Sequence, residues 1–403
     1  MISKDYKQNK EQVLTLYDEY VNTCKVAGKK VDDSISEQAK KIRDEIFNLM
    51  ILGEAKSGKS TFINAYLGKE VVPMDVRQCT SAIIKIRKGD KFELMAKTAG
   101  GGKTAVVGYD KIRTFLKDHA AISDKYRNIP ITTINNELLI KYHGKKIPNQ
   151  IMASFLEVEA KDNIFNMNID EYNNLIREYV KENAASWGKI ITEMELTYQL
   201  PDEMQGITII DSPGVCARGG VSELTEKYIN HADAIVFLKP ISGQALESTQ
   251  FNQFMKNMSV ERNKKALFLV LTRASNVNET ELNRLMDEAY KQFNMLDKDN
   301  ILVVDSKAEL YVKYLSTFST LDEIKNELIK LNDNKTLDDF VTATYVKTAG
   351  DFGNGDKVDF INSLKEKSHF ADVYSSFDRF GRYAHYLLLH DVLKCTYDLY
   401  VKL

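Results

Sequence analysis

GEAKSGKS, residues 53–60, decides the fold of this chain, and it stands between an apolar run and a segment with helical spacing. It fits the pattern G-x-x-x-x-G-K-[S/T] at every position. The glycines allow backbone N–H groups to wrap a polyphosphate, and the start of the following helix adds its positive dipole end. Lys59 is expected to reach the β- and γ-phosphates, and the Ser60 hydroxyl suits Mg²⁺ as a hard oxygen ligand. The alternative, a chance glycine turn, is disfavoured by the strand–loop–helix context, so the stretch predicts a phosphate-binding loop. The residues of the loop predicted to contact nucleotide are Gly53, Glu54, Ala55, Lys56, Ser57, Gly58, Lys59, Ser60 and Thr61.

Two segments downstream complete the predicted site. The turn Asp211-Ser212-Pro213-Gly214 closes the apolar run GITIID, where a carboxylate can hold Mg²⁺ through water and the Gly214 N–H can sense a γ-phosphate. Thr80 lies between the helix of the loop and the next strand, where a threonine can join the Mg²⁺ shell and act as a switch. Ser81 is its nearest rival. The predicted metal ligands are Ser60, Thr80 and Asp211, and Lys59 and Thr80 are predicted to be catalytic.

The rest of the chain predicts an α/β protein. Short apolar runs alternate with helical patterns from residue 190 onward, for example AIVFL (234–238), ALFLVLT (266–272) and ILVVD (301–305). This alternation predicts the fold class of a phosphate-loop nucleotide-binding domain, with a mostly parallel central sheet covered by helices. Amphipathic helices at both chain ends each need an apolar partner, and we expect them to form one helical bundle. Residues from about 122 to 165 give no clear pattern.

Composition narrows the function classes. Lysine and arginine number 55 against 57 for aspartate and glutamate, and this balance argues against nucleic acid as a partner. The four cysteines lie far apart and predict reduced thiols in the cytoplasm. Unbroken apolar runs are too short to cross a bilayer, so peripheral attachment to the inner face of the cell membrane is the membrane association left open.

The motifs together resemble the dynamin superfamily of large GTPases, specifically its bacterial dynamin-like members. The resemblance rests on GEAKSGKSTFINAYLG, QCTSAI, DSPGV and helices on both sides of the nucleotide-binding domain. It implies a GTPase (G) domain that binds GTP or GDP with Mg²⁺ as cofactor, dimerises under nucleotide control and drives a helical bundle, often at membranes. The expected partners are a second copy through the G domains or a related dynamin-like subunit.

The expected domains follow from this layout. Residues 1–47 are predicted to form the N-terminal bundle helices and residues 48–349 the G domain, with an insertion around 88–200. Residues 357–403 are predicted to form the C-terminal bundle helices. Because the chain ends soon after its first C-terminal bundle helix, it is expected to be a piece of a longer protein or a subunit whose partner supplies the rest.

The base-contacting segment departs from the family pattern. The family's TKxD motif uses its aspartate to bond two guanine nitrogens, and Thr272-Arg273-Ala274-Ser275 stands here. The Arg273 stem can lie along the purine, but Ser275 offers no carboxylate, and a missing partner of that kind lowers discrimination. Asn276 and Asn278 are alternative contacts. Ser306 and Lys307 resemble the last base-contacting loop, with an ordinary helix start as the alternative.

The catalytic machinery is also incomplete. Val215 follows Gly214, and Ala55 and Lys56 stand where eukaryotic dynamins place a glutamine and a serine, so no water-positioning side chain is apparent. Slow turnover is therefore expected, with Lys56 as a candidate for extra charge at the β–γ bridge, in cis or across a dimer. Two alternatives stay open: a phosphate-loop NTPase with relaxed base preference, and a switch or scaffold that binds nucleotide without hydrolysing it.

Overall fold

The computed structural model describes most of the chain. The described residues are 4–53, 57–72, 83–119, 124–126, 128–160, 167–200, 202–211, 232–241, 266–350 and 353–402. Within them, no helix has both the length and the apolar character that crossing a bilayer requires.

A single nine-stranded sheet forms the centre of the molecule, with strand order β4-β3-β5-β2-β6-β1-β7-β8-β9. The half that follows β6 is parallel, because β1 pairs in parallel with both β6 and β7, and β7, β8 and β9 continue the same direction. Antiparallel pairing begins between β2 and β6 and returns between β3 and its two neighbours. This arrangement confirms the predicted mostly parallel sheet. The strands are β1 Phe47–Gly53, β2 Ile83–Lys88, β3 Glu93–Thr98, β4 Lys103–Val107, β5 Ile191–Tyr198, β6 Ile207–Asp211, β7 Ala234–Pro240, β8 Leu267–Thr272 and β9 Ile301–Val303.

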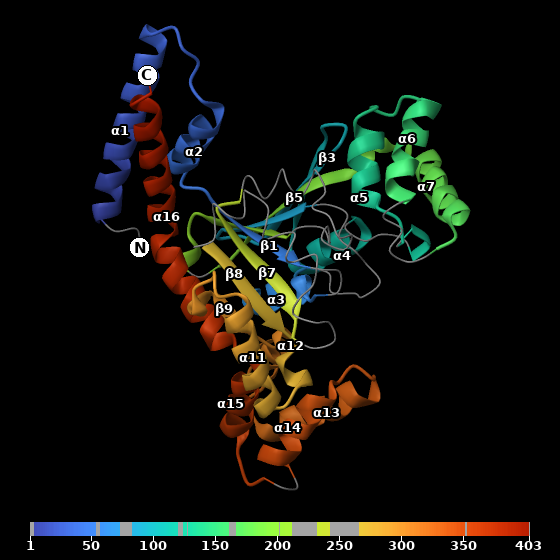
Figure 1. Ribbon diagram of the computed structural model, residues 1–403. Coiled ribbons are helices and arrows are strands. Elements are labelled where there is room, and N and C mark those ends of the chain that lie inside the picture. Colours follow the sequence, from blue (N-terminus) through green and yellow to red (C-terminus); the bar gives the residue numbers. More distant parts are fainter. Residues whose placement is uncertain are drawn as a thin grey trace.

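Helices cover both faces of the sheet, because its parallel strands carry apolar side chains on each side. Leu49 and Ile51 of β1 face a core shared with α3 (Lys59–Leu67) and the first half of α16 (Phe370–Tyr400). Met50 and Leu52 face the opposite core, which α11 covers. Figure 1 shows three further groups of helices around the sheet. The other helices are α1 Lys4–Val26, α2 Asp33–Asp44, α4 Tyr109–His119, α5 Ile131–Ile134, α6 Asn149–Ala160, α7 Ile169–Asn183, α11 Glu279–Gln292, α12 Ser306–Leu315, α13 Leu321–Asp333, α14 Asp339–Thr348 and α15 Lys357–Ser368.

The two ends of the chain meet in a helical bundle, as predicted. Helices α1, α2 and the last turns of α16 lie side by side, with Val13, Ile42 and Val392 buried in the seam. A second seam buries Tyr17 and Ala39 nearer the far end. Lys41 of α2 fastens the bundle to the sheet through an ion pair of 2.8 Å with Asp233, which precedes β7.

Helix α16 belongs to two cores along its 31 residues. Its first half packs on the sheet, where Phe377 meets Phe62 of α3 and Phe268 of β8. Only its second half enters the bundle. The apolar residues from 370 onward therefore pack first against the sheet and then within the bundle. Helix α15 packs with α12 and α14. The domain boundaries stay predictions, and we propose that the bundle part of the C-terminal segment begins within α16.

Most of the segment around 122–165 gave no pattern, and its described residues, 124–126 and 128–160, belong to a small helical unit with its own core. Helices α5, α6 and α7 enclose Ile134, Phe155 and Ile176. Between α5 and α6 a π-helix, η2, covers Asn135–Ile140 and leads to a turn at 141–144. This unit stands on the β3–β5 side of the sheet, away from the bundle (Figure 1).

Candidate functional site

Strand β1 and helix α3 position the predicted phosphate loop at the carboxyl edge of the parallel strands. Gly53 must be glycine because a Cβ there would lie 2.5 Å from the Ser57 Oγ and 2.6 Å from the Leu238 carbonyl oxygen. Gly58 must be glycine for another reason, since it adopts φ 93° and ψ 22° just before α3. Residues 54–56, including the predicted Glu54, Ala55 and Lys56, lie outside the described part of the chain.

Lys59 reaches back across the loop. Its Nζ donates a hydrogen bond of 3.0 Å to the carbonyl oxygen of Gly53, so the ammonium group lies over the end of β1. Ser60 and Thr61 follow in the first turn of α3 and are half-buried. Here the free backbone N–H groups and the helix dipole favour a bound anion. The geometry therefore presents a cation and a helix start on the same side of the loop.

The loop is also held by a residue of β8, two strands away from β1 in the sheet. The Thr272 hydroxyl at the end of β8 donates a hydrogen bond of 3.0 Å to the Ser57 carbonyl oxygen, and both residues are buried. The Ser57 Oγ is itself buried without a hydrogen bond among the described residues. Thr272, predicted from the base-contacting motif, thus contacts the phosphate loop directly.

Asp211 is the most unusual ionisable residue of the site. It ends β6, where it is adjacent to Ile51 of β1, and it is completely buried. Neither of its carboxylate oxygens has a hydrogen-bond partner within the part of the chain that the structure describes. Burial raises its pKa to about 7, against the opposing effect of the Lys59 charge. A buried carboxylate without a partner costs free energy, and a cation bound beside it would offset that cost.

Asp211 and Ser60 fit a magnesium ion by their chemistry. Both supply hard oxygen atoms, and Mg²⁺ binds through one or two such side chains together with phosphate oxygens and water. The other predicted ligand, Thr80, and the predicted phosphate sensor Gly214 lie outside the described residues, as does Ser81. The unsatisfied oxygens of Asp211 are the observation in the structure that favours a cation here.

The predicted base-contacting segment lies at the same edge of the sheet, after β8, which β7 separates from β1. Arg273 follows β8 in a left-handed conformation, with φ 66°, and its side chain is exposed. Ser275 forms two hydrogen bonds with Asp305. Its backbone N–H, over 3.2 Å, and its hydroxyl both donate to Oδ2 of Asp305. Asp305 in turn caps α12 by accepting from the Ala308 N–H over 2.9 Å. Asn278 caps α11 instead, since its side chain accepts from the Glu281 N–H.

Asp305 directly precedes Ser306 and Lys307, which resemble the last base-contacting loop, but the sequence did not show that its carboxylate contacts Ser275. It comes from the loop after β9 and is buried beside Ser275, so a carboxylate stands next to the position where the family motif carries one. In the sequence, Asp305 has only the pattern of a helix N-cap, an aspartate three residues before Ala308. Of the neighbouring predicted residues, Ser306 is buried, whereas Lys307 forms an ion pair of 2.6 Å with Asp338 before α14.

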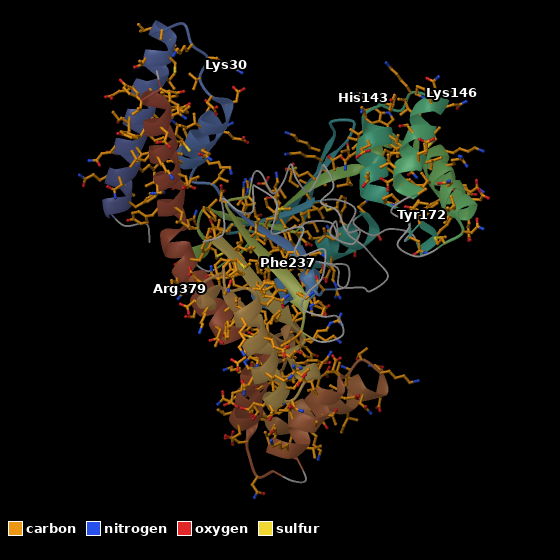
Figure 2. All side chains as sticks on the ribbon, in the orientation of Figure 1. Lys30, His143, Lys146, Tyr172, Phe237 and Arg379 are labelled. Atoms are coloured by element: carbon orange, nitrogen blue, oxygen red, sulfur yellow. The ribbon has the colours of Figure 1, made fainter. Side chains whose placement is uncertain are left out.

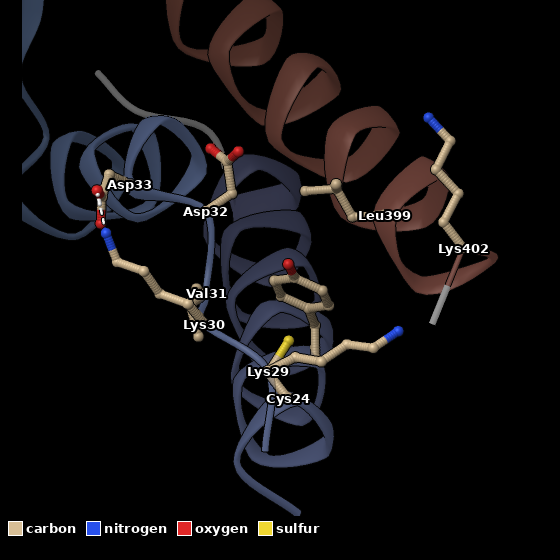
Figure 3. A pocket seen from close by; sticks show the side chains of 9 residues that line it. Cys24, Lys29, Lys30, Val31, Asp32, Asp33, Leu399 and Lys402 are labelled. Carbon is tan, nitrogen blue, oxygen red and sulfur yellow. Dashed lines mark hydrogen bonds and ion pairs between the residues drawn. The ribbon is translucent and has the colours of Figure 1, made fainter. Parts of the chain in front are cut away.

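A cavity elsewhere in the molecule does not contribute to this site. It encloses about 410 Å³ at the far end of the bundle, between α1, α16 and the turn that precedes α2 (Figure 3). Buried Cys24 lies at its base, and Lys30 at its rim pairs with Asp33 over 2.7 Å. The loop and Asp211 lie at the sheet, on the other side of the bundle seam.

Comparison with known proteins decides the family. Residues 49–274, more than half of the chain, match the model of the Dynamin family. The chain belongs to the dynamin family. This confirms the resemblance inferred from the motifs, and the family is one of large GTPases.

Curated relatives of this dynamin-family chain are bacterial. Dynamin-like protein A of Bacillus subtilis is 23% identical over 316 residues, which cover 74% of this chain and 25% of the relative. The bacterial dynamin-like protein of Nostoc punctiforme is 23% identical over 206 residues, covering 51% of this chain and 22% of the relative. The chain therefore matches about a quarter of the length of these relatives.

Solved structures similar to the dynamin-family chain include a chain of an oligomerised bacterial dynamin pair, described as sensing and tethering membranes. It is 15% identical, with a TM-score of 0.38, and the match covers 94% of this chain and 48% of that one. The bacterial dynamin GTPase LeoA from ETEC is 12% identical, also with a TM-score of 0.38, and the match covers 100% of this chain and 49% of that one.

Proposed function

We propose that this chain binds GTP with Mg²⁺ and hydrolyses it slowly, and that nucleotide-dependent dimerisation of its G domain changes the conformation of the bundle at a membrane surface. The observation that carries the proposal is the position of two side chains. The Lys59 ammonium group lies across the glycine loop, and the buried Asp211 carboxylate has no hydrogen-bond partner among the described residues. Membership of a GTPase family and bacterial dynamin relatives support it.

Lys59, the first turn of α3 and Thr272 each have a role in this proposal. Lys59 holds the β- and γ-phosphates, and its hydrogen bond to Gly53 positions the ammonium group before the nucleotide arrives. The N-terminus of α3 binds the same phosphates through its N–H groups. Thr272 fixes the loop through Ser57, so that the phosphate cradle is preorganised.

Magnesium would be held by Ser60 and Asp211, and by Thr80 as predicted. When bound, the ion would neutralise the charge that develops on the phosphate oxygens. The residues of the chain supply positive charge and hold the phosphates in place. Basal turnover is proposed to be slow, because the sequence shows no side chain that would position the attacking water, and Lys56 is proposed to add charge at the β–γ bridge.

A second candidate, relaxed base preference, is favoured by the contact between Ser275 and Asp305. Because the Ser275 hydroxyl donates to Asp305, its lone pairs are left to accept from a base, and both guanine and adenine carry N–H donors. Competition of GTP and ATP for the chain measures this. A preference for GTP below about a hundredfold would support relaxed selectivity, since sites with a complete polar partner reach far higher ratios.

Phosphate release under single-turnover conditions tests hydrolysis, with Lys59→Ala as the control. We expect slow release that the substitution abolishes and that rises per molecule with protein concentration. Release that does not depend on concentration would contradict the dimer mechanism. Nucleotide binding without release would instead identify a non-hydrolysing switch.

A further inference from the structure

Three segments of the insertion meet at one corner of the molecule. The tip of the β3–β4 hairpin contacts the 3₁₀ turn η3 (Trp187–Lys189) through a hydrogen bond of 3.1 Å from the Gly100 N–H to the Gly188 carbonyl oxygen. The turn after η2 packs against Trp187 of the same 3₁₀ turn, so closely that a Cβ on Gly144 would lie only 2.0 Å from the Trp187 ring. The His143 ring meets the Trp187 ring edge-on at 5.3 Å. Figure 2 shows His143 and Lys146 at this end of the helical unit.

Exposed lysines gather at this corner. Residues 99–104, 140–148 and 184–192 contain five lysines, all exposed, and no aspartate or glutamate. Within the described chain none of the five makes an ion pair, whereas Lys97 pairs with Glu193 and Lys125 pairs with Glu182 nearby. We call these five residues the lysine corner: Lys103, Lys141, Lys145, Lys146 and Lys189.

The fold brings these charges together at a cost. The hairpin register sets Lys103 directly opposite Lys97, a like-charged pair that weakens strand pairing. Lys97 has a carboxylate partner on its other side, and Lys103 has none among the described residues. In a chain whose net charge is −2, five uncompensated lysines form a local field that attracts an anionic surface.

The chemistry of the corner favours a lipid surface over a nucleic acid. All five cations are lysines, which act as point charges and lack the planar fork with which arginine binds nucleic-acid phosphates at two points. The ring of Trp187 is half-buried, meets His143 edge-on and packs against Gly144. Exposed aliphatic side chains stand on the helices beside it, with Ile151 39% and Val158 58% exposed on α6. Lysines beside exposed aliphatic residues are the pattern of peripheral membrane contact.

We propose that the lysine corner of the insertion docks on an anionic lipid bilayer. The lysines lie against the headgroups, and the adjoining face of α6 reaches the interface. The inference deepens the membrane part of the proposed function and does not depend on nucleotide binding or hydrolysis. The corner is formed by the β3–β4 hairpin and the turn before β5, and strands β2 and β6 stand between β5 and β1, which leads into the phosphate loop.

Vesicle binding by the full chain tests the proposal. Cosedimentation is measured with phosphatidylcholine vesicles, with and without phosphatidylserine, at low and high salt. The chain contains one tryptophan, so the fluorescence of Trp187 reports contact at the corner itself. We expect binding and a fluorescence change only with the vesicles that contain phosphatidylserine, and we expect high salt to abolish both.

The matched variants separate local from total charge. K103E/K145E/K146E reverses three charges at the corner, and K325E/K335E/K347E reverses three exposed lysines near α13 and α14. A lysine at a membrane surface contributes about fivefold in affinity, so we expect a loss of about a hundredfold for the first variant and less than tenfold for the second. Equal losses, binding to phosphatidylcholine alone, or tighter binding of single-stranded RNA than of vesicles would overturn the proposal. GTP binding by the same preparations shows that each variant is folded and tests the nucleotide site separately.

Discussion

At the scale of one residue, we propose that Asp211 links folding stability to nucleotide binding. Its carboxyl group is buried without a hydrogen bond in the described chain, and burial raises its pKa to about 7. An unfolded aspartate has a pKa of about 3.9, so between about pH 4 and pH 7 the folded state binds the proton more tightly. The nucleotide-free protein therefore loses stability as pH rises through this window, by about 4 kcal/mol at most.

Asp211→Asn removes this buried charge. We expect the variant to be more stable than the parent chain at pH 8, by about 2–4 kcal/mol, with a gain that disappears near pH 4. Denaturant unfolding of both proteins across this range measures the difference. A variant that is less stable at pH 8 would show that the carboxylate is already satisfied without a ligand.

Ser275 tests how the chain reads the base. Ser275→Ala removes a hydroxyl that is held by Asp305 and leaves the phosphate loop intact. Loss of one neutral hydrogen bond of about 1 kcal/mol predicts a weakening of GTP binding by about fivefold, with little change for free triphosphate. Competition binding measures both affinities. An unchanged GTP affinity would remove Ser275 from the base site.

The glycine loop and its lysine could be predicted from sequence because their chemistry is local and their spacing is fixed by the phosphate. The partner of Ser275 could not be predicted in this way. Asp305 comes from another strand, 30 residues away, and its sequence context is that of an ordinary helix cap. The contact exists because parallel strands bring their carboxyl ends together.

At the scale of elements, the ion pair between Lys41 and Asp233 joins α2 to the sheet. Asp233 also accepts the Asn48 N–H over 2.8 Å, so it ties the bundle to the start of β1. Burial is the largest influence on its pKa, which is raised, while Lys41 opposes that rise. Because Lys41 is the cation that compensates this buried carboxylate, the pair holds the bundle to the sheet.

Lys41→Met leaves the Asp233 charge buried and should lower the free energy of unfolding by about 3 kcal/mol at neutral pH. The loss should shrink in acid, where the carboxyl group is protonated. The double variant with Asp233→Asn should recover part of it, and a double-mutant cycle measures the coupling. Additive effects of the two substitutions would contradict the assigned pair.

The helical unit of the insertion shows where periodicity fails. Its π-helix over Asn135–Ile140 adds a residue to one turn, so the apolar positions before and after it fall out of the ordinary helical register. Helix α7 keeps that register, because its buried residues Tyr172, Ile176 and Tyr179 follow one another at helical spacing. The core of the unit, around Tyr172 and Leu138, required the structure.

At the scale of the whole molecule, α16 connects the proposed nucleotide site to the bundle. Phe62 lies one turn after the phosphate loop on α3 and meets both Phe370 and Phe377 of α16. The same helix continues into the bundle, where Leu388 and Val392 are buried. The apolar spacing of α16 predicted a long helix, but spacing alone could not divide it between two cores.

Phe377→Ala should weaken this connection. We expect it to lower the free energy of unfolding by about 3–5 kcal/mol, as Phe360→Ala should in the separate core of α15. Hydrogen exchange of α1 and α2 with and without nucleotide separates the two variants. The nucleotide-dependent difference should vanish in Phe377→Ala and persist in Phe360→Ala. Its persistence in both would show that α16 does not carry the signal.

The glycine loop and Lys59 are proposed to bind the phosphates of a nucleoside triphosphate. Titration calorimetry of the full chain with GTP and Mg²⁺ tests this proposal most directly, with Lys59→Ala as the matched variant. We expect saturable binding by the parent chain and a loss of at least about a hundredfold in the variant, because a charge-assisted contact contributes about 3 kcal/mol. A folded parent chain that takes up no GTP, or a variant that binds it equally well, would contradict the account.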